Sequence, residues 1–125
     1  MNAGTFVLLC LAGGVGAALR YVVDALIRRR VSSTFPWPTA LINLPGSFVL
    51  GLLTGLVAGR FVGTELSLVL GTGFLGGYTT FSTASYETVE LVRARHYGTA
   101  LLYGVGVLAS GIALAAAGYL WGQRI

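Results

Sequence analysis

The sequence predicts an all-α membrane protein with four transmembrane helices in a single domain that covers residues 1–125. Of the 125 residues, 55% are hydrophobic and only 10% are charged, whereas soluble globular domains average about 25% charged residues. The mean hydropathy of +0.81 agrees with a membrane location. The apolar residues form four long stretches, and a helix needs about 20 residues to cross the hydrocarbon core of a bilayer. Four such stretches predict four spans.

The predicted spans run, in order, from about Gly4 to Ile27, Trp37 to Gly59, Leu66 to Leu91 and Gly98 to Gly122. The first connection is the longest, and its prolines prevent a continued helix. In the second span Gly51, Gly55 and Gly59 repeat every fourth residue, which places small residues on one face and favours close helix contact. The fourth span is rich in alanine and glycine and is also expected to pack closely.

The third span differs because paired glycines and polar residues interrupt its apolar sequence near the middle. Gly76 and Gly77 are adjacent, and five hydroxyl residues follow between Thr79 and Ser85, together with Phe81. An unwound backbone in hydrocarbon must find protein, water or ions for its free N–H and C=O groups. We therefore expect a helix that is broken in mid-membrane, and a permeation path or binding site at the break.

The arginines are distributed unevenly between the two sides of the membrane. The first and third connections share one side and hold Arg28, Arg29, Arg30, Arg93 and Arg95, whereas the second connection and the C-terminal tail hold Arg60 and Arg124. Because positively charged loops tend to stay in the cytoplasm, both termini are expected outside it. The basic residues are too scattered for nucleic-acid binding, which needs a basic face or stripe.

Each of three side chains in the spans has a structural and a functional interpretation. Asn43 could make a hydrogen bond between helices, or its amide could donate to a permeating anion. Arg20 could pair with Asp24 or reach the membrane interface, or its charge could concentrate anions at a pore mouth. Phe81 could be a packing residue, but the partially positive edge of its ring could also contact an anion.

Enzyme chemistry has little support in this sequence. Glu87 and Glu90 are expected to be solvated or paired at the end of a span, and no nucleophile is accompanied by a base. The segment from Gly71 to Gly76 matches the pattern G-x-G-x-x-G. A dinucleotide fingerprint needs a βαβ unit, however, and this chain has no room for one.

Together and in order, these motifs resemble the Fluc/CrcB fluoride channel family over nearly the whole chain. The residues that carry the resemblance are Gly13-Gly-Val-Gly-Ala-Ala-Leu-Arg-Tyr21, Asn43 with Gly46-Ser-Phe48, and Gly73-Phe-Leu-Gly-Gly-Tyr-Thr-Thr-Phe-Ser-Thr83 with Glu87-Thr88-Val89. The resemblance implies a multi-pass channel of the inner (plasma) membrane, surrounded by membrane lipid, that exports fluoride passively and lowers its toxicity in the cytoplasm. It also implies an antiparallel dimer that encloses two narrow pores.

The resemblance further implies roles for individual residues. The anion pore would be lined by Asn43, Phe81, Ser82, Thr83 and Tyr103, and Arg20 would lie in the pore vestibule. A structural sodium ion (Na⁺) at the dimer centre would be held by two backbone carbonyls. By motif matching these carbonyls belong to Gly76 and Thr79.

The chain departs from the family pattern at two positions. Family members usually have a second phenylalanine three residues after the first, but here Ala84 follows Phe81 at that spacing, and Pro45 replaces an ordinary apolar residue. A homodimer with opposed subunits should have nearly balanced arginines, and this chain does not. One hypothesis is therefore a heterodimer with an oppositely oriented homologue, in which Ala84 impairs one of the two pores.

Two functions from other classes stay open at this point. A non-transporting membrane assembly subunit would explain the glycine faces, but it leaves the hydroxyl residues and Phe81 without a role. A small four-helix proton-coupled multidrug transporter would need a carboxylate deep in the membrane. The first span has no acidic residue between Gly4 and Leu19.

Overall fold

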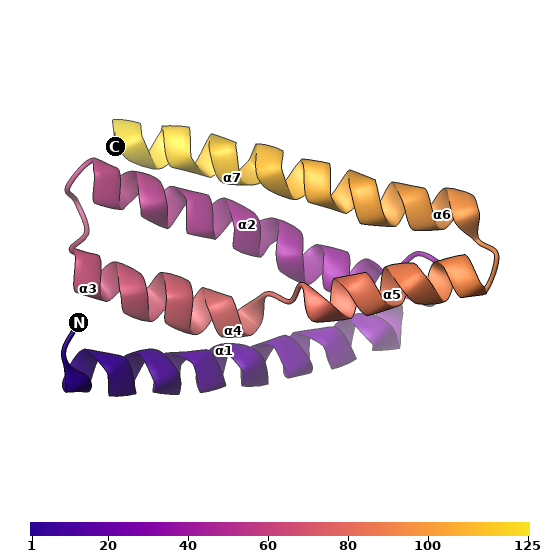
Figure 1. Cartoon of the computed structure of the whole chain (residues 1–125), viewed down its shortest axis with the longest axis horizontal. Coiled ribbons are helices and arrows are strands. Elements are labelled where there is room, and N and C mark those ends of the chain that lie inside the picture. Colours follow the sequence, from indigo (N-terminus) through magenta and orange to yellow (C-terminus); the bar gives the residue numbers. More distant parts are fainter.

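The computed structural model describes all 125 residues, which form an all-helical protein. The helices form four elongated passes, and Figure 1 shows both termini at the same end. The first pass is α1 (Ala3–Arg30) and the second is α2 (Trp37–Ala58). The fourth consists of α6 (Tyr97–Leu101), the π-helical segment η2 (Leu102–Gly106) and α7 (Val107–Arg124). These three passes are long and apolar enough to cross a membrane.

The third pass is interrupted. It contains α3 (Thr64–Ser67), the π-helical segment η1 (Leu68–Leu75) and α4 (Gly76–Tyr78), and then continues as α5 (Ser82–Arg93). The three residues between α4 and α5 are not helical, and Figure 1 shows the thin connection between the two ribbons. We call these residues, Thr79 to Phe81, the break.

The sequence predicts the interruption at Gly76 and Gly77 together with the hydroxyl residues that follow. The part concerning the glycines is wrong, because both glycines belong to α4 and the break begins at Thr79. The glycines serve contact between helices instead. A Cβ atom at Gly77 would lie 2.1 Å from the carbonyl oxygen of Gly13, and one at Gly16 would lie 2.1 Å from that of Phe74. Only glycine allows α1 to approach the third pass this closely.

Small residues join α2 and α7 in the same way, as the sequence predicts. A Cβ at Gly51 would lie 2.0 Å from the carbonyl oxygen of Ala115, and one at Gly118 would lie 2.3 Å from that of Phe48. Each helix therefore presents glycine to the backbone of the other. This contact holds the second and fourth passes side by side (Figure 1).

The surface is apolar rather than charged along most of its length. Only 18 of the 125 residues are buried, and large side chains such as Phe6, Leu11 and Ile112 are exposed. So much exposed apolar surface is expected where lipid, rather than water, surrounds the helices. A small core of Ala40, Leu91, Ala100 and Tyr103 lies near the end of the molecule opposite to the termini.

That end also carries the first and third connections, with five arginines. Arg28 pairs with Asp24 at 2.8 Å, and Arg93 pairs with Glu90 at 3.4 Å. Arg29, Arg30 and Arg95 make no ion pair, and neither do Arg60 and Arg124 at the other end. Two of the five arginines at this end are therefore paired with carboxylates in the folded chain.

Candidate functional site

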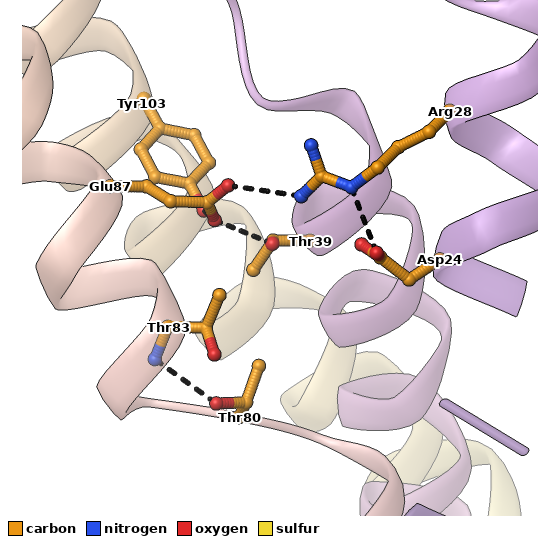
Figure 2. Close-up of polar contacts among 7 residues, drawn as sticks. All are labelled: Asp24, Arg28, Thr39, Thr80, Thr83, Glu87 and Tyr103. Carbon is orange, nitrogen blue, oxygen red and sulfur yellow. Dashed lines mark hydrogen bonds and ion pairs between the residues drawn. The ribbon is translucent and has the colours of Figure 1, made fainter. Parts of the chain in front are cut away.

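The break is held from α2 by a pair of reciprocal hydrogen bonds between Asn43 and Thr80. The Thr80 N–H donates to Oδ1 of Asn43 at 2.9 Å, and Nδ2 of Asn43 donates to the Thr80 carbonyl at 2.7 Å. Thr80 in turn begins the next helix, because its Oγ1 accepts the Thr83 N–H at 3.1 Å. The two threonines are shown in Figure 2. Asn43 therefore bonds α2 to the third pass, as its structural interpretation predicts, although its partner is a non-helical residue.

Arg20 holds the other side of the break from α1. Its Nε donates to the Gly77 carbonyl at 3.3 Å, near the C-terminal end of α4. A positive charge is favourable there because the helix dipole places partial negative charge at this end. The alternative pairing with Asp24 is absent, since Asp24 accepts from Arg28 one turn further along.

Several backbone groups at the break have no partner in the chain. The carbonyls of Gly76 and Thr79 accept no hydrogen bond, because the Thr80 N–H donates to Asn43 and the Thr83 N–H donates to Thr80 Oγ1. The N–H groups of Phe81, Ser82 and Ala84 likewise donate to no acceptor in the chain. The break therefore presents free carbonyl oxygens on the α4 side and free N–H groups at the start of α5.

Two cavities adjoin the break. The first, of about 390 Å³, is lined by 18 residues that include Asn43, Thr79, Thr80, Phe81 and Tyr103. Ala84 lines it as well, at the position where the sequence lacks a second phenylalanine. Three of the five expected pore residues thus share one cavity.

The second cavity, of about 310 Å³, contains Arg20 and Thr83 together with Asp24, Arg28 and Thr39. Thr80 lines both cavities, so the break lies between them. The structure therefore separates the expected residues into two groups, with Arg20 and Thr83 on the side that bears the charged side chains.

Two of the expected pore residues, Phe81 and Ser82, are exposed at the outer surface of the chain, although Phe81 also borders the first cavity. Phe81 is 83% exposed, and its ring contacts little of its own chain. Ser82 lines neither cavity and is also exposed; its Oγ lies 3.4 Å from Oγ1 of Thr80. The Phe81 ring is thus accessible to molecules outside this chain.

Glu87 organises a polar cluster that the sequence analysis did not predict. Its Oε1 accepts hydrogen bonds from Thr39 at 2.5 Å and from the Tyr103 hydroxyl at 3.0 Å, while Arg28 lies 3.7 Å from Oε2. Figure 2 shows the cluster, with Arg28 between Asp24 and Glu87. Its members come from α1, α2, α5 and η2, and no spacing in the sequence links them.

Comparisons with known proteins agree with these features. Residues 7–119 match the family described as CrcB-like protein, Camphor Resistance (CrcB). "Fluoride-specific ion channel FluC 1" of Leifsonia xyli is 53% identical over 90% of this chain and 82% of its own length. "Fluoride-specific ion channel FluC" of Thermus thermophilus is 42% identical over 96% of both chains. "Fluoride-specific ion channel FluC 3" of Bifidobacterium longum is 45% identical, over 91% of this chain and 94% of its own. The resemblance seen in the sequence motifs is confirmed, and the chain belongs to the CrcB family.

Proposed function

We propose that this chain is a subunit of a fluoride-specific ion channel in the plasma membrane, which exports fluoride passively and lowers its toxicity in the cytoplasm. The observation that carries the proposal is the 53% identity, over most of both chains, to a relative named as a fluoride-specific ion channel. The chain has membrane-length apolar helices and a polar break between two cavities, as a permeation path requires. As a channel subunit it is not an enzyme.

The groups at the start of α5 suit a small anion. The N–H groups of Phe81, Ser82 and Ala84 are free, and the N-terminus of a helix carries partial positive charge. The Ser82 and Thr83 hydroxyls can add donors, and the edge of the Phe81 ring is weakly positive. None of these groups is a full charge, so an anion can bind and still leave.

The pore is formed where two chains meet as an antiparallel dimer. Phe81 is almost fully exposed in the single chain, and its cavity is bordered by Asn43 and Tyr103. A second chain would enclose these residues together with Ser82 and Thr83. Arg20, in the charged cavity, provides the vestibule. The five-to-two arginine distribution and Ala84 favour a heterodimer with an oppositely oriented homologue.

A structural sodium ion at the dimer centre fits the break. The carbonyl oxygens of Gly76 and Thr79 have no hydrogen-bond partner, and oxygen atoms are the ligands that hard cations prefer. No cluster of acidic, histidine or cysteine side chains offers a competing cation site. When bound, the ion would supply positive charge at the centre of the dimer, while Asn43 and Arg20 keep the break in shape.

Fluoride efflux from proteoliposomes tests the proposal. The chain is reconstituted alone and together with a homologue, and fluoride efflux is compared with chloride efflux from matched vesicles. Selective fluoride efflux in either preparation supports a channel, and selective efflux only with the homologue supports the heterodimer. Equal flux of both ions, or none in either preparation, would contradict the channel. Efflux that stops without a proton gradient would favour a proton-coupled carrier instead.

A further inference from the structure

We propose that Asn43 is a positioning residue that keeps the third pass broken and that acts on the pore through the backbone of Thr80. The inference rests on the proposed channel function only for its consequence for fluoride flux. Its structural basis is that two acceptors compete for the N–H group of Thr80. One is the side-chain oxygen of Asn43, and the other is the main-chain oxygen of Gly76.

The helical hydrogen bonding of α4 continues up to the N–H of Thr79, although the backbone of Thr79 itself is extended. The Thr79 N–H still donates to the Leu75 carbonyl at 2.9 Å, and the Thr79 hydroxyl donates to the same carbonyl at 2.8 Å. The next N–H along the chain belongs to Thr80 and would donate to Gly76 if the helix continued. It donates to Oδ1 of Asn43 instead. The helix therefore ends where the Thr80 N–H donates to Asn43 rather than to the Gly76 carbonyl.

Neither a proline nor a left-handed glycine in the third pass explains this ending. The segment from Gly76 to Ser85 contains no proline, and all glycines in the chain have negative φ. The two glycines that precede the break are helical. The competing acceptor comes from α2, 37 residues earlier in the sequence.

Both partners gain from the arrangement, which fixes the plane of the Asn43 carboxamide. Oδ1 accepts from the Thr80 N–H and Nδ2 donates to the Thr80 carbonyl, so the side chain satisfies both main-chain groups of one residue. A buried main-chain group without a partner is costly, especially away from water. The carboxamide therefore stabilises the break, because it pairs both main-chain groups of Thr80.

The position of Thr80 determines the neighbouring features of the site. It leaves the Gly76 carbonyl free, lets Thr80 Oγ1 accept from Thr83, and places Phe81 just before the first residue of α5. Without Asn43, the Thr80 N–H can return to Gly76 and α4 can extend into the break. That change would occupy a carbonyl oxygen and rotate Phe81 away from its present direction.

Nuclear magnetic resonance of the full chain in liposomes can test the inference without fluoride. The ¹³Cα chemical shift of Thr79 reports its backbone, which is extended at φ −83° and ψ 160°. Asn43→Leu removes both hydrogen bonds, and Asn43→Ala does so with less bulk. In each variant we expect the Thr79 shift to move from the extended range to the helical range. Ser47→Ala is the matched control, because Ser47 lies one turn further along α2 and bonds only to the Asn43 carbonyl.

An unchanged Thr79 shift in either Asn43 variant that assembles would overturn the inference, even if fluoride efflux were lost. Asn43 would then act as a direct ligand of the anion. A shift to the helical range in both variants, with Ser47→Ala like the unmodified chain, supports it. Because the chemical shift is read in the absence of fluoride, a failure of the channel proposal would leave this result interpretable.

Discussion

The Tyr103 hydroxyl donates its hydrogen to Glu87, with 3.0 Å between the two oxygens. Tyr103 is 1% exposed and lines the cavity beside the break, yet its only hydroxyl hydrogen is engaged by a carboxylate. An anion in that cavity therefore meets the ring and not the hydroxyl hydrogen. This arrangement separates the structural role of the hydroxyl from the role that we propose for the ring in the pore.

Tyr103→Phe should consequently weaken folding more than conduction. We expect the free energy of unfolding to fall by about 1 kcal/mol, the usual worth of one lost hydrogen bond. Fluoride efflux should fall by less than about tenfold. Thermal unfolding and efflux from liposomes measure the two effects, and Thr39→Val is the control that removes the other hydroxyl from Glu87. Abolished efflux at unchanged stability would show that the Tyr103 hydroxyl contacts the anion.

Phe81→Ile should reduce fluoride efflux strongly while leaving assembly intact. The ring is 83% exposed and contributes little to packing within the chain, so assembly should be retained. Fluoride efflux should fall by at least about tenfold, because isoleucine lacks an aromatic edge for the anion. Size-exclusion chromatography and efflux provide the measurements. Phe61→Ile is the control, since Phe61 is also exposed but lies in the connection between α2 and α3 rather than in the break. Equal efflux from both variants would show that Phe81 does not line the pore.

Gly77→Ala should be strongly destabilising. The new Cβ would lie 2.1 Å from the Gly13 carbonyl oxygen. Because the Cβ is fixed to its own Cα and the oxygen is a backbone atom, one of the two backbones would have to move. We expect a loss of about 2 kcal/mol or more in the free energy of unfolding. Gly14→Ala is a matched control, because a Cβ there meets nothing within 4 Å. If the two variants melt at the same temperature, α1 and the third pass are not held by this contact.

Ala84→Phe should raise fluoride efflux from the chain reconstituted alone. Ala84 lines the cavity of about 390 Å³, which offers space for a larger ring beside Tyr103. A second aromatic edge at this position should increase fluoride efflux severalfold without affecting chloride. Ala84→Leu supplies comparable bulk without an aromatic edge and is the control. Equal efflux from the two variants would mean that Ala84 is not what limits the pore.

Removal of sodium should lower the stability of the assembled protein. A ligand present at about a hundredfold above its dissociation constant stabilises the folded state by about 2.7 kcal/mol. We therefore expect a lower melting temperature when sodium is replaced by N-methylglucamine at constant ionic strength. Titration with sodium should restore it. A melting temperature independent of sodium would argue against a role for the Gly76 and Thr79 carbonyls as ion ligands.

The sequence predicts the helical passes well because hydrophobicity over about 20 residues is a physical requirement for crossing a bilayer. It also predicts an interruption in the third pass, but it assigns that interruption to Gly76 and Gly77 as well as to the hydroxyl residues, where the break lies. Glycine is ambiguous in membrane helices, since it serves both flexible backbone and close packing. Here it serves packing, and only the position of α1 reveals this.

The partners of the polar side chains are the part that sequence could not provide. Asn43 bonds to a residue 37 positions away, and Glu87 gathers side chains from three other elements. Such contacts depend on how the helices are placed, not on periodicity along any one of them. The same reason explains why the sequence leaves the partner of Arg20 open, with Asp24 as one possibility, while the partner in the structure is a carbonyl of the third pass.

The unpaired arginines bear on how the protein keeps its orientation. In the folded chain three arginines at the arginine-rich end and two at the other have no acidic partner. These side chains would have to cross the hydrocarbon core if a folded chain turned over in the membrane, and a charged arginine there is costly. An orientation, once adopted, therefore persists.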